Sequence, residues 1–385
     1  MSQIRRRILV VAMLDSIHTA RWLSQFNEEE VDFLLFPSKP YRKLHVQINE
    51  LLPKGKITTY SLFGGRAHSL APYFYFALNK IAGHKALNLS QRFLLQRCIK
   101  RFKPDYVHAM EIQGAGYITA RLAKKNRSYK LICSTWGSDI VFFKDNQRHR
   151  KLIIKALKNA DFYSAECERD YRMAFDLGFQ GKNLPIIPVA GSYNHEILYS
   201  EQSLTSSRNQ IIVKSYGGTF GLGSTSIQVL NQILNENLDL KVLFYSVTED
   251  LYDQIREIKT RFGDRVRWIP AKELLQHHEL LQEFKKSRLY LGVSRCDGIS
   301  TSFLESLCTG AFPVQTNTSC ANEWIEKGAI GRLPNPSANE IYEAINSCLH
   351  DDDLLNLAQV NNIQIARKYL SREKIYPLAR EFYSL

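Results

Sequence analysis

Hydrophobic positions in the first half of the chain gather into short continuous runs, separated by longer stretches with helical spacing. Such runs predict strands buried on both faces, because a strand with one solvated face would alternate apolar and polar residues. The expected strands are Ile8–Met13, Asp32–Phe36, Tyr106–Met110, Lys130–Ser134 and Phe162–Ala165. The expected helices are Ala20–Phe26, Leu89–Phe102, Tyr117–Lys125 and Arg148–Asn159. This alternation predicts a parallel α/β sheet.

A second series of the same kind begins after Ser200–Asn209, a polar and unpatterned stretch that is typical of a linker. At 385 residues the chain is long enough for two domains, each with its own core. We therefore expect one domain over residues 1–190 and another over 191–364, followed by a closing helical stretch, Ile363–Tyr383. The expected strands of the second domain are Ile211–Lys214, Lys241–Ser246, Val266–Ile269, Leu289–Val293 and Ala311–Thr316.

Composition is that of an ordinary globular protein, with 44% hydrophobic and 23% charged residues. No apolar run approaches the roughly 20 residues of a membrane-spanning helix. The opening RRRILVVAML has the look of a signal peptide, but Asp15 ends the apolar run and no small-residue cleavage site follows, so we expect a buried strand. Seven scattered cysteines without C-x-x-C spacing indicate reduced thiols and a cytoplasmic protein.

Charge is unevenly distributed between the two halves. Residues 1–190 contain 31 Lys and Arg against 15 Asp and Glu, whereas residues 191–385 contain 20 against 23. Such asymmetry predicts that the first domain faces an anionic partner: nucleic acid, an anionic membrane surface or a lipid diphosphate. The basic, aromatic segment Arg66–Lys103 fits either amphipathic helices packed on the sheet or a surface that docks on a membrane, and both can hold together.

The most informative stretch is DGISTSFLESLCTGAFPV, from Asp297 to Val314. A short loop opens a helix whose candidate N-caps are Ser300, Thr301 and Ser302, and Gly310 closes it. Free N–H groups and the positive end of the helix dipole favour a diphosphate there. Glu305, about one turn in, could accept hydrogen bonds from a ribose diol. The pattern predicts a nucleotide-sugar site, and the alternative is a capped surface helix.

This stretch resembles the Glu–x7–Glu motif of the retaining glycosyltransferases of family 4, with Asp297 in place of the first acid and Glu305 as the second. The resemblance is strong in the last third of the chain, weaker in the first, and extends over nearly the whole chain. Its further segments are ANEWIEKGAIGRL (Ala321–Leu333), KPDYVHAMEIQGAG (Lys103–Gly116), STWGSDI (Ser134–Ile140), SAECERD (Ser164–Asp170) and SIHTARW (Ser16–Trp22). It implies a GT-B fold: two Rossmann-like domains facing across a cleft, with a C-terminal helix over about residues 365–385 crossing back to the first.

The resemblance implies that the second domain binds the nucleotide-sugar donor. It assigns Asp297 a catalytic role and places the donor on Glu305, Gly298, Ile299, Ser300, Thr301 and Ser302. The strand IIVK and the following GGTFGLGST add Lys214, Gly217 and Gly218 near the donor phosphates, although the family's second phosphate-binding cation has no clear equivalent. Ser224 stands where a P-loop requires lysine, so a nucleotide-hydrolysing P-loop is not expected, and the alternative for this loop is a plain strand–helix turn.

In the first domain, the candidates follow strands at their carboxyl ends, where open α/β sheets bind ligands. Asp139 and His108 are candidate catalytic residues, with a helix N-cap and simple packing as the respective alternatives. Trp136 occupies the apparent place of a family histidine. Glu166 and Glu168 are expected to cap or flank a helix. The candidate acceptor-binding residues are His18, Arg21, Gly116, Tyr117 and Trp136.

The resemblance implies a retaining glycosyltransferase, and we expect it to be metal-independent and to need no cofactor, since the nucleotide-sugar is a substrate. No Asp-x-Asp lies in a suitable loop, so helix N-termini and cations would neutralise the leaving diphosphate. We expect a saccharide or lipid-linked saccharide acceptor, in surface polysaccharide or lipopolysaccharide synthesis, at the inner face of the cytoplasmic membrane. The alternatives are a GT-B sugar-nucleotide epimerase, an inactive transferase-like protein and a nucleic-acid-binding protein, although no nucleic-acid module is recognisable.

Overall fold

A computed structural model describes residues 5–27, 29–41, 43–52, 57–59, 91–122, 124–273 and 275–385. The chain forms two compact units. Unit 1 comprises Met1–Gly191 together with Ile375–Leu385, and unit 2 comprises Ser192–Lys374. Much of the basic, aromatic segment that begins at Arg66, including Phe74 and Phe76, lies outside the described residues.

Unit 1 is built on a seven-stranded parallel sheet in the order β3-β2-β1-β4-β5-β6-β7. The chain runs outward from β1 to β3 and then continues on the other side at β4. The gap between β1 and β4 is therefore the switch point at which open α/β sheets bind ligands. All five expected strands are present; β3 and β7 were not expected, because edge strands this short leave little pattern. The strands are β1 (Arg6–Ala12), β2 (Val31–Pro37), β3 (Ile57–Thr59), β4 (Tyr106–Met110), β5 (Lys130–Ser134), β6 (Phe162–Ser164) and β7 (Lys182–Asn183).

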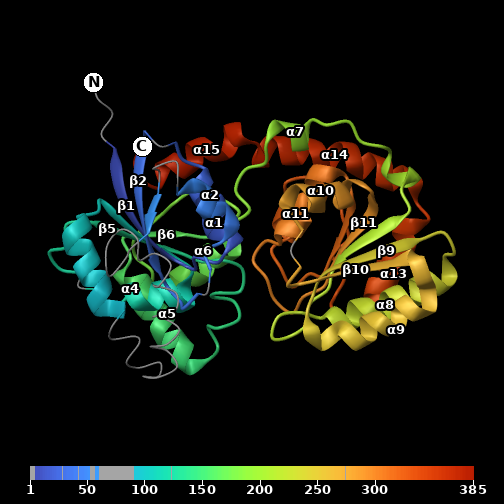
Figure 1. Ribbon diagram of the computed structural model, residues 1–385, viewed down its shortest axis with the longest axis horizontal. Coiled ribbons are helices and arrows are strands. Elements are labelled where there is room, and N and C mark those ends of the chain that lie inside the picture. Colours follow the sequence, from blue (N-terminus) through green and yellow to red (C-terminus); the bar gives the residue numbers. More distant parts are fainter. Residues whose placement is uncertain are drawn as a thin grey trace. The chain divides into compact units, whose positions relative to one another are not determined.

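Helices cover both faces of this sheet (Figure 1). Alternate residues of β1 point to opposite faces. Val10 packs with α1, α2 and α15, whereas Val11 packs with helical residues 91–102 and the segment after β4. A further core lies around α5 and α6. The helical elements are α1 (Ile17–Ser24), α2 (Val46–Leu51), a π-helical turn (Ile112–Gly116), α4 (Tyr117–Thr119), α5 (Gln147–Asn159), α6 (Glu168–Asp176) and α15 (Arg372–Glu381).

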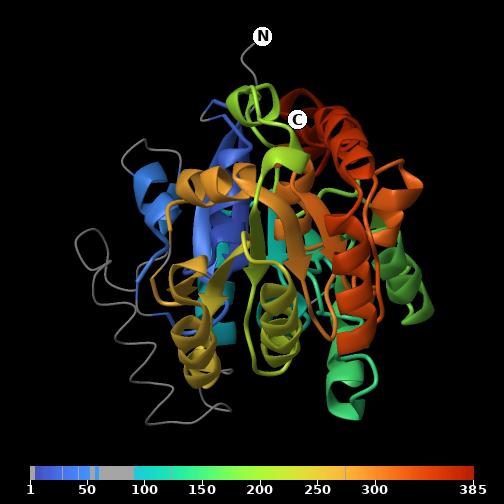
Figure 2. The same cartoon turned by 90° about the vertical axis from the view of Figure 1, so that its right-hand side faces the viewer.

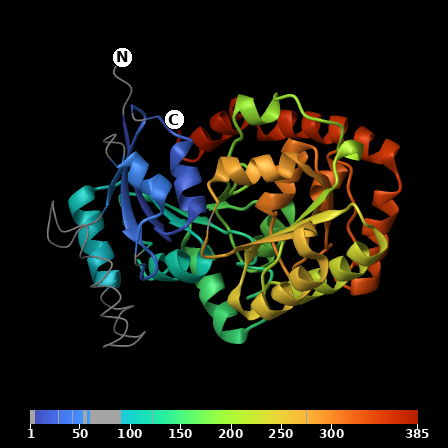
Figure 3. The same ribbon diagram turned by 45° about the vertical axis from the view of Figure 1, so that its right-hand side comes forward.

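The C-terminal segment is part of the core of unit 1. Helix α15, the red helix beside the C-terminus in Figure 3, buries Ile375 and Ala379 in the same cluster as β1 and α1. Just beyond it, the fully buried hydroxyl of Tyr383 accepts a hydrogen bond from Trp22 Nε1 at 2.9 Å. It also lies 2.7 Å from His108 Nδ1. These contacts explain why residues so far apart in the sequence belong to one unit.

Unit 2 is built on a five-stranded parallel sheet in the order β10-β9-β8-β11-β12. Helices α8 and α9 lie side by side on one face, with α13 beside α8 (Figure 2), and α10, α11 and α14 lie on the other (Figure 1). The strands are β8 (Gln210–Lys214), β9 (Lys241–Val247), β10 (Val266–Pro270), β11 (Ser287–Gly292) and β12 (Phe312–Gln315). The helices are α7 (His195–Leu198), α8 (Gly223–Glu236), α9 (Tyr252–Phe262), α10 (His277–Lys285), α11 (Thr301–Thr309), α12 (Asn322–Glu326), α13 (Ala338–Leu349) and α14 (Asp352–Leu370).

The prediction of a helix over Tyr117–Lys125 was wrong. The helical path begins earlier, in the π-helical turn, and α4 ends at Thr119. The side chain of Asn159 explains the early end, because its amide donates to the carbonyls of Thr119 and Leu122 at 3.0 and 3.2 Å. Carbonyls that a continuing helix would use are thereby satisfied from α5 instead.

The prediction of a linker at Ser200–Asn209 was also wrong. Thr205 is fully buried, and its hydroxyl donates to the Gly310 carbonyl at 2.7 Å. The guanidinium of Arg208 is buried and donates to the carbonyls of Ser287 and Thr309. Polar residues here bond to the ends of β-strands and helices, so the segment is a packed part of unit 2.

The prediction of one closing helix over Ile363–Tyr383 was also wrong. The structure has two helices there, α14 and α15, which are divided at Ser371.

We expect Tyr383→Phe to lower the free energy of unfolding by about 1–3 kcal/mol. The substitution removes the hydroxyl group to which Trp22 Nε1 and His108 Nδ1 are hydrogen-bonded, and both nitrogens are buried. Urea unfolding followed by fluorescence measures the change. Tyr129→Phe is the matched control in unit 1, since its hydroxyl has no hydrogen-bond partner among the residues that the structure describes. Equal stability of the Tyr383 variant and the wild type would contradict this account.

Candidate functional site

The loop from β11 to α11 is held rigidly at the carboxyl edge of the unit 2 sheet. Asp297 accepts from its neighbour Gly298 N at 2.9 Å, and its own N–H donates to the Thr318 carbonyl. The Gly298 carbonyl accepts from Cys320 N at 2.7 Å. These bonds tie the loop after β11 to the loop after β12, so that Asp297 has a fixed place at the mouth of α11.

The N-terminus of α11 presents its amides without a side-chain cap. Ser300 is the N-cap residue, as expected, but its hydroxyl lies 3.3 Å from the Tyr290 hydroxyl and caps nothing. Ser302 is similarly engaged, because its hydroxyl accepts from Tyr245 at 2.5 Å. Gly310 closes the helix in the left-handed conformation, at φ 71°, as expected. The amides of the first helical turn, which no residue inside the helix can accept from, are available for an anion.

Glu305 lies inside α11 and is nearly inaccessible to solvent, with 2% of its surface exposed. Its Oε1 lies 2.9 Å from Nε2 of His277, the first residue of α10. Nothing in the sequence indicated this histidine, because it lies 28 residues before the carboxylate it meets. A buried carboxylate beside an anion-binding helix end is an arrangement that can accept hydroxyl groups of a ligand.

The glycine-rich loop after β8 approaches the same edge. Gly221 pairs with Ser294, and the Arg295 amide donates to the Phe220 carbonyl at 2.8 Å, so this loop lies against the segment before Asp297. Burial raises the pKa of the Tyr216 hydroxyl, and the nearby Asp297 carboxylate raises it further. The ammonium of Lys214 lies 5.3 Å from the centre of the Tyr216 ring.

Of the glycines in this loop, Gly217 and Gly218 were predicted to bind the donor, and the structure favours glycine at each for a different reason. A Cβ on Gly217 would lie 1.8 Å from a carboxylate oxygen of Asp250, whereas Gly218 has a φ of +72°. The Gly217 amide, expected to meet a phosphate, instead donates to the Thr248 hydroxyl at 2.8 Å. The Asp250 carboxylate beside Gly217 also repels a diphosphate. The α11 terminus is therefore the better phosphate site of the two.

In unit 1, His108 is a packed residue with both ring nitrogens in use. Because Trp22 Nε1 can only donate, the Tyr383 hydroxyl accepts from it and donates its own proton to His108 Nδ1. His108 Nε2 then carries the ring proton and donates to the Ser134 hydroxyl at 2.7 Å. Burial lowers the pKa of His108 to about 3, so the ring is neutral. A cavity of about 20 Å³ beside it holds roughly one water, and these contacts favour packing over catalysis.

Asp139 connects two loops at the carboxyl edge of the unit 1 sheet. Its Oδ2 accepts from the amides of Trp136 and Ile112, each at 3.0 Å. Burial raises the pKa of this carboxyl to about 8, and the charge of Glu111 adds to the effect. Oδ2 therefore holds the loop after β4 and the loop after β5 together within unit 1. The role of Asp139 toward an acceptor hydroxyl stays a prediction.

Two neighbouring acids were assigned no site role from the sequence. Glu111 has an unusual φ of +95°, and its carboxylate accepts from the amides of Gly114 and Ala115, both at 2.7 Å. Glu166 accepts from Gly137 N at 2.9 Å and from Val189 N at 2.7 Å. Both acids hold the loops that follow β4, β5 and β6. Glu168 begins α6, as expected from its pattern.

The remaining acceptor candidates lie in unit 1, on α1, on the helical turns after β4 and on the loop after β5. The rings of His18 and Trp136 meet edge to face, with centroids 5.7 Å apart. Arg21 lies on α1, one turn after His18. Gly116 ends the π-helical turn, and the hydroxyl of Tyr117 lies 2.9 Å from His149 Nδ1 on α5. The structure thus brings His18 together with Trp136, while Tyr117 is paired with α5.

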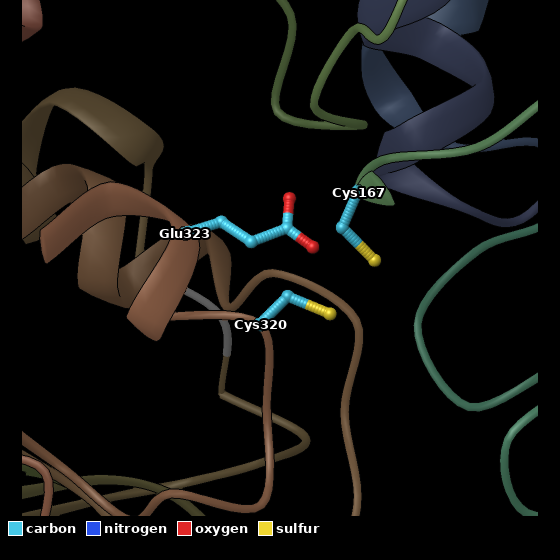
Figure 4. A group of neighbouring side chains, drawn as sticks. All are labelled: Cys167, Cys320 and Glu323. Atoms are coloured by element: carbon cyan, nitrogen blue, oxygen red, sulfur yellow. The ribbon is translucent and has the colours of Figure 1, made fainter. Parts of the chain in front are cut away.

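Cys320 and Glu323 are potential metal ligands whose side chains point the same way from the loop and helix after β12 (Figure 4). Their ligand atoms lie within 4.8 Å of one another. Among the described residues of unit 2, no third His, Cys, Asp or Glu joins them. Cys167, also drawn there, belongs to unit 1, where it precedes α6.

Residues 7–164 match the family described as Glycosyl transferase 4-like. No curated protein matches the chain in sequence. Several solved structures match it over nearly its whole length. HepE from Anabaena, solved with UDP and glucose, has a TM-score of 0.70 and 15% identity, covering 99% of this chain and 100% of its own. Sucrose-phosphate synthase from Thermosynechococcus elongatus has a TM-score of 0.73 and 12% identity, covering 99% and 98%.

TarM from S. aureus, solved as a mutant with UDP and saccharide ligands, has a TM-score of 0.70 and 10% identity, covering 99% of this chain and 100% of its own. At these identities the structural likeness shows the fold, and the family match covers most of unit 1. Both agree with the two parallel sheets described above. The chain thus has the GT-B fold, and its residues 7–164 are glycosyl transferase 4-like.

Proposed function

We propose that this enzyme transfers a sugar from a nucleotide-sugar donor, with a UDP-sugar as the first candidate, and that unit 2 binds the donor. The uncapped N-terminus of α11 carries the proposal, because its amides and Glu305 lie one turn apart on one helix. That spacing suits a diphosphate and the ribose attached to it. HepE and TarM were solved with UDP, which favours uridine among the nucleotides.

Retention of the anomeric configuration is the second part of the proposal. It is supported by the resemblance of Asp297 and Glu305 to the paired acids of the family 4 transferases. Asp297 stands at the mouth of α11, in place to meet the donor sugar, and its position is fixed by the loop bonds described above. One of the neighbours in structure is a sucrose-phosphate synthase, which favours glycosyl transfer over epimerisation.

Glu305→Gln should raise the donor KM, or lower kcat/KM, by about tenfold or more, because a charge-assisted hydrogen bond contributes about 1.5–3 kcal/mol. Donor turnover and thermal shift with UDP, GDP, ADP and CMP measure the effect and identify the base. Glu326→Gln, at an exposed position of α12, is the matched control. Wild-type kinetics in a folded Glu305 variant would remove this residue from the donor site.

We also propose that transfer needs no divalent metal. The α11 amides, together with the cations of Lys214 and Arg295, would neutralise the departing diphosphate. Activity should therefore be unchanged in excess EDTA, measured as release of the nucleoside diphosphate. Loss of activity that Mg²⁺ or Mn²⁺ restores would contradict this part of the proposal.

For the acceptor, we propose a saccharide or lipid-linked saccharide of a surface polysaccharide pathway, met at the cytoplasmic face of an anionic membrane. The excess of basic residues before position 190 supports it. Arg92, Lys100 and Arg101 are exposed on the helical residues 91–102, as is Phe93 at 63%. Each cation near an anionic bilayer contributes about 1 kcal/mol. Among the described residues, no helix is both long and apolar enough to cross a membrane.

Charge reversal at Lys100, Arg101 and Lys103 should reduce co-sedimentation with anionic liposomes, and salt should weaken the wild-type binding because it screens exposed charges. Reversal of three exposed unit 2 cations, Lys241, Arg256 and Lys374, is the control for net charge. Equal partitioning onto neutral and anionic vesicles, or no binding at low salt, would leave a soluble acceptor.

A further inference from the structure

His277 makes a direct contact with the buried carboxylate of the proposed donor site. Its Nε2 lies 2.9 Å from Glu305 Oε1, and the two side chains are 27% and 3% exposed. An ionised carboxylate only accepts hydrogen bonds, so the imidazole donates. The contact therefore joins the first turn of α10 to the middle of α11, and only the histidine end of it reaches solvent.

Three neutral side chains interact electrostatically with this carboxylate. Glu305 adds to the effect of burial in raising the pKa values of Tyr245, Tyr290 and Cys308. The Tyr245 and Tyr290 hydroxyls are bonded to Ser302 and Ser300. None of these three side chains carries a positive charge. The positively polarised N–H of His277, in contrast, is in direct contact with the Glu305 carboxylate.

The imidazole is held in place from more than one side. The start of α10 is fixed, because Gln276 N donates to the Glu279 carboxylate at 2.8 Å. The ring also lies against Tyr193, with centroids 6.5 Å apart. Tyr193 is itself 3% exposed, and its amide donates to the Leu370 carbonyl at 2.8 Å. A ring confined in this way can fix the orientation of the carboxylate that it bonds.

We propose that His277 is a positioning residue that orients the Glu305 carboxylate toward the ribose diol of the donor nucleotide. The imidazole holds Oε1 of the carboxylate and so fixes the direction in which the carboxylate group faces when the ribose hydroxyls arrive. This inference rests on the proposed donor site and deepens it. It assigns a residue that the sequence motif does not contain, on a helix other than α11.

The test compares binding of UDP and 2′-deoxy-UDP by calorimetry, with the matching GDP and ADP pairs if either of those is the nucleotide bound. His277→Ala should weaken UDP binding by about tenfold or more, the usual effect of losing a charge-assisted hydrogen bond. The effect of His277→Ala on the binding of 2′-deoxy-UDP should be much smaller. This nucleotide lacks one of the two ribose hydroxyls that the oriented carboxylate is proposed to bind. His277→Gln, which restores an N–H donor near the Nε2 position, should recover most of the ribose preference.

Two further variants separate a positioning role from a structural one. His278→Ala changes the adjacent, exposed residue of the same helix and should bind UDP as the wild type does. In a Glu305→Gln background, His277→Ala should have little further effect, because the two residues act through one carboxylate. Circular dichroism and thermal unfolding establish that each variant is folded.

The outcomes distinguish this inference from the proposed function beneath it. If no nucleoside diphosphate binds the wild-type protein, both are overturned. If UDP binds and Glu305→Gln weakens it while His277→Ala does not, only the positioning role is overturned. Equal weakening of UDP and 2′-deoxy-UDP by His277→Ala also overturns it, because that result places the histidine on the base or phosphates instead.

Discussion

Parallel strand pairing is the constraint on which both candidate sites depend. Every strand pair of the two described sheets is parallel, so the carboxyl ends of the strands in each sheet lie at one edge. In unit 2 the register pairs Lys214 with Gly292. The loop after β8 and the loop that leads to Asp297 therefore start side by side. In unit 1 the same rule places Ser134 beside Met110 and brings its hydroxyl to His108.

The hydrogen bonds of buried hydroxyl groups then determine whether the amides at the start of a helix stay available for a ligand. In α11 the hydroxyls of Ser300 and Ser302 bond to tyrosines of β11 and β9, although serine at this position commonly caps its own helix. In α1 the opposite holds, because Ser16 accepts from the amide of His18. The two helices show that residue type alone does not determine whether a helix end is capped. The pairing of Ser300 with Tyr290 keeps the α11 amides for an anion.

The sequence allowed most of the fold and part of the candidate site to be predicted. Largely apolar runs predicted Tyr106–Met110 and Lys130–Ser134 with their observed bounds, because strands buried on both faces have few polar positions. Gly310 marked the end of α11 because few other residues adopt a positive φ at low cost. Long-range side-chain contacts left no such pattern. Asn159 ends α4 from another helix, and His277 reaches Glu305 across 28 residues. Glu111, at a φ that acids rarely adopt, gave no signal either.

The central claim is that the carboxyl edge of unit 2, at α11, binds the donor nucleotide. A crystal structure of the protein with its nucleoside diphosphate tests this most directly. The account predicts phosphate oxygens within hydrogen-bond distance of the amides at the start of α11 and the ribose hydroxyls on Glu305. A nucleotide bound in unit 1, or on the Gly217 loop beside Asp250 with the α11 amides unoccupied, would contradict it.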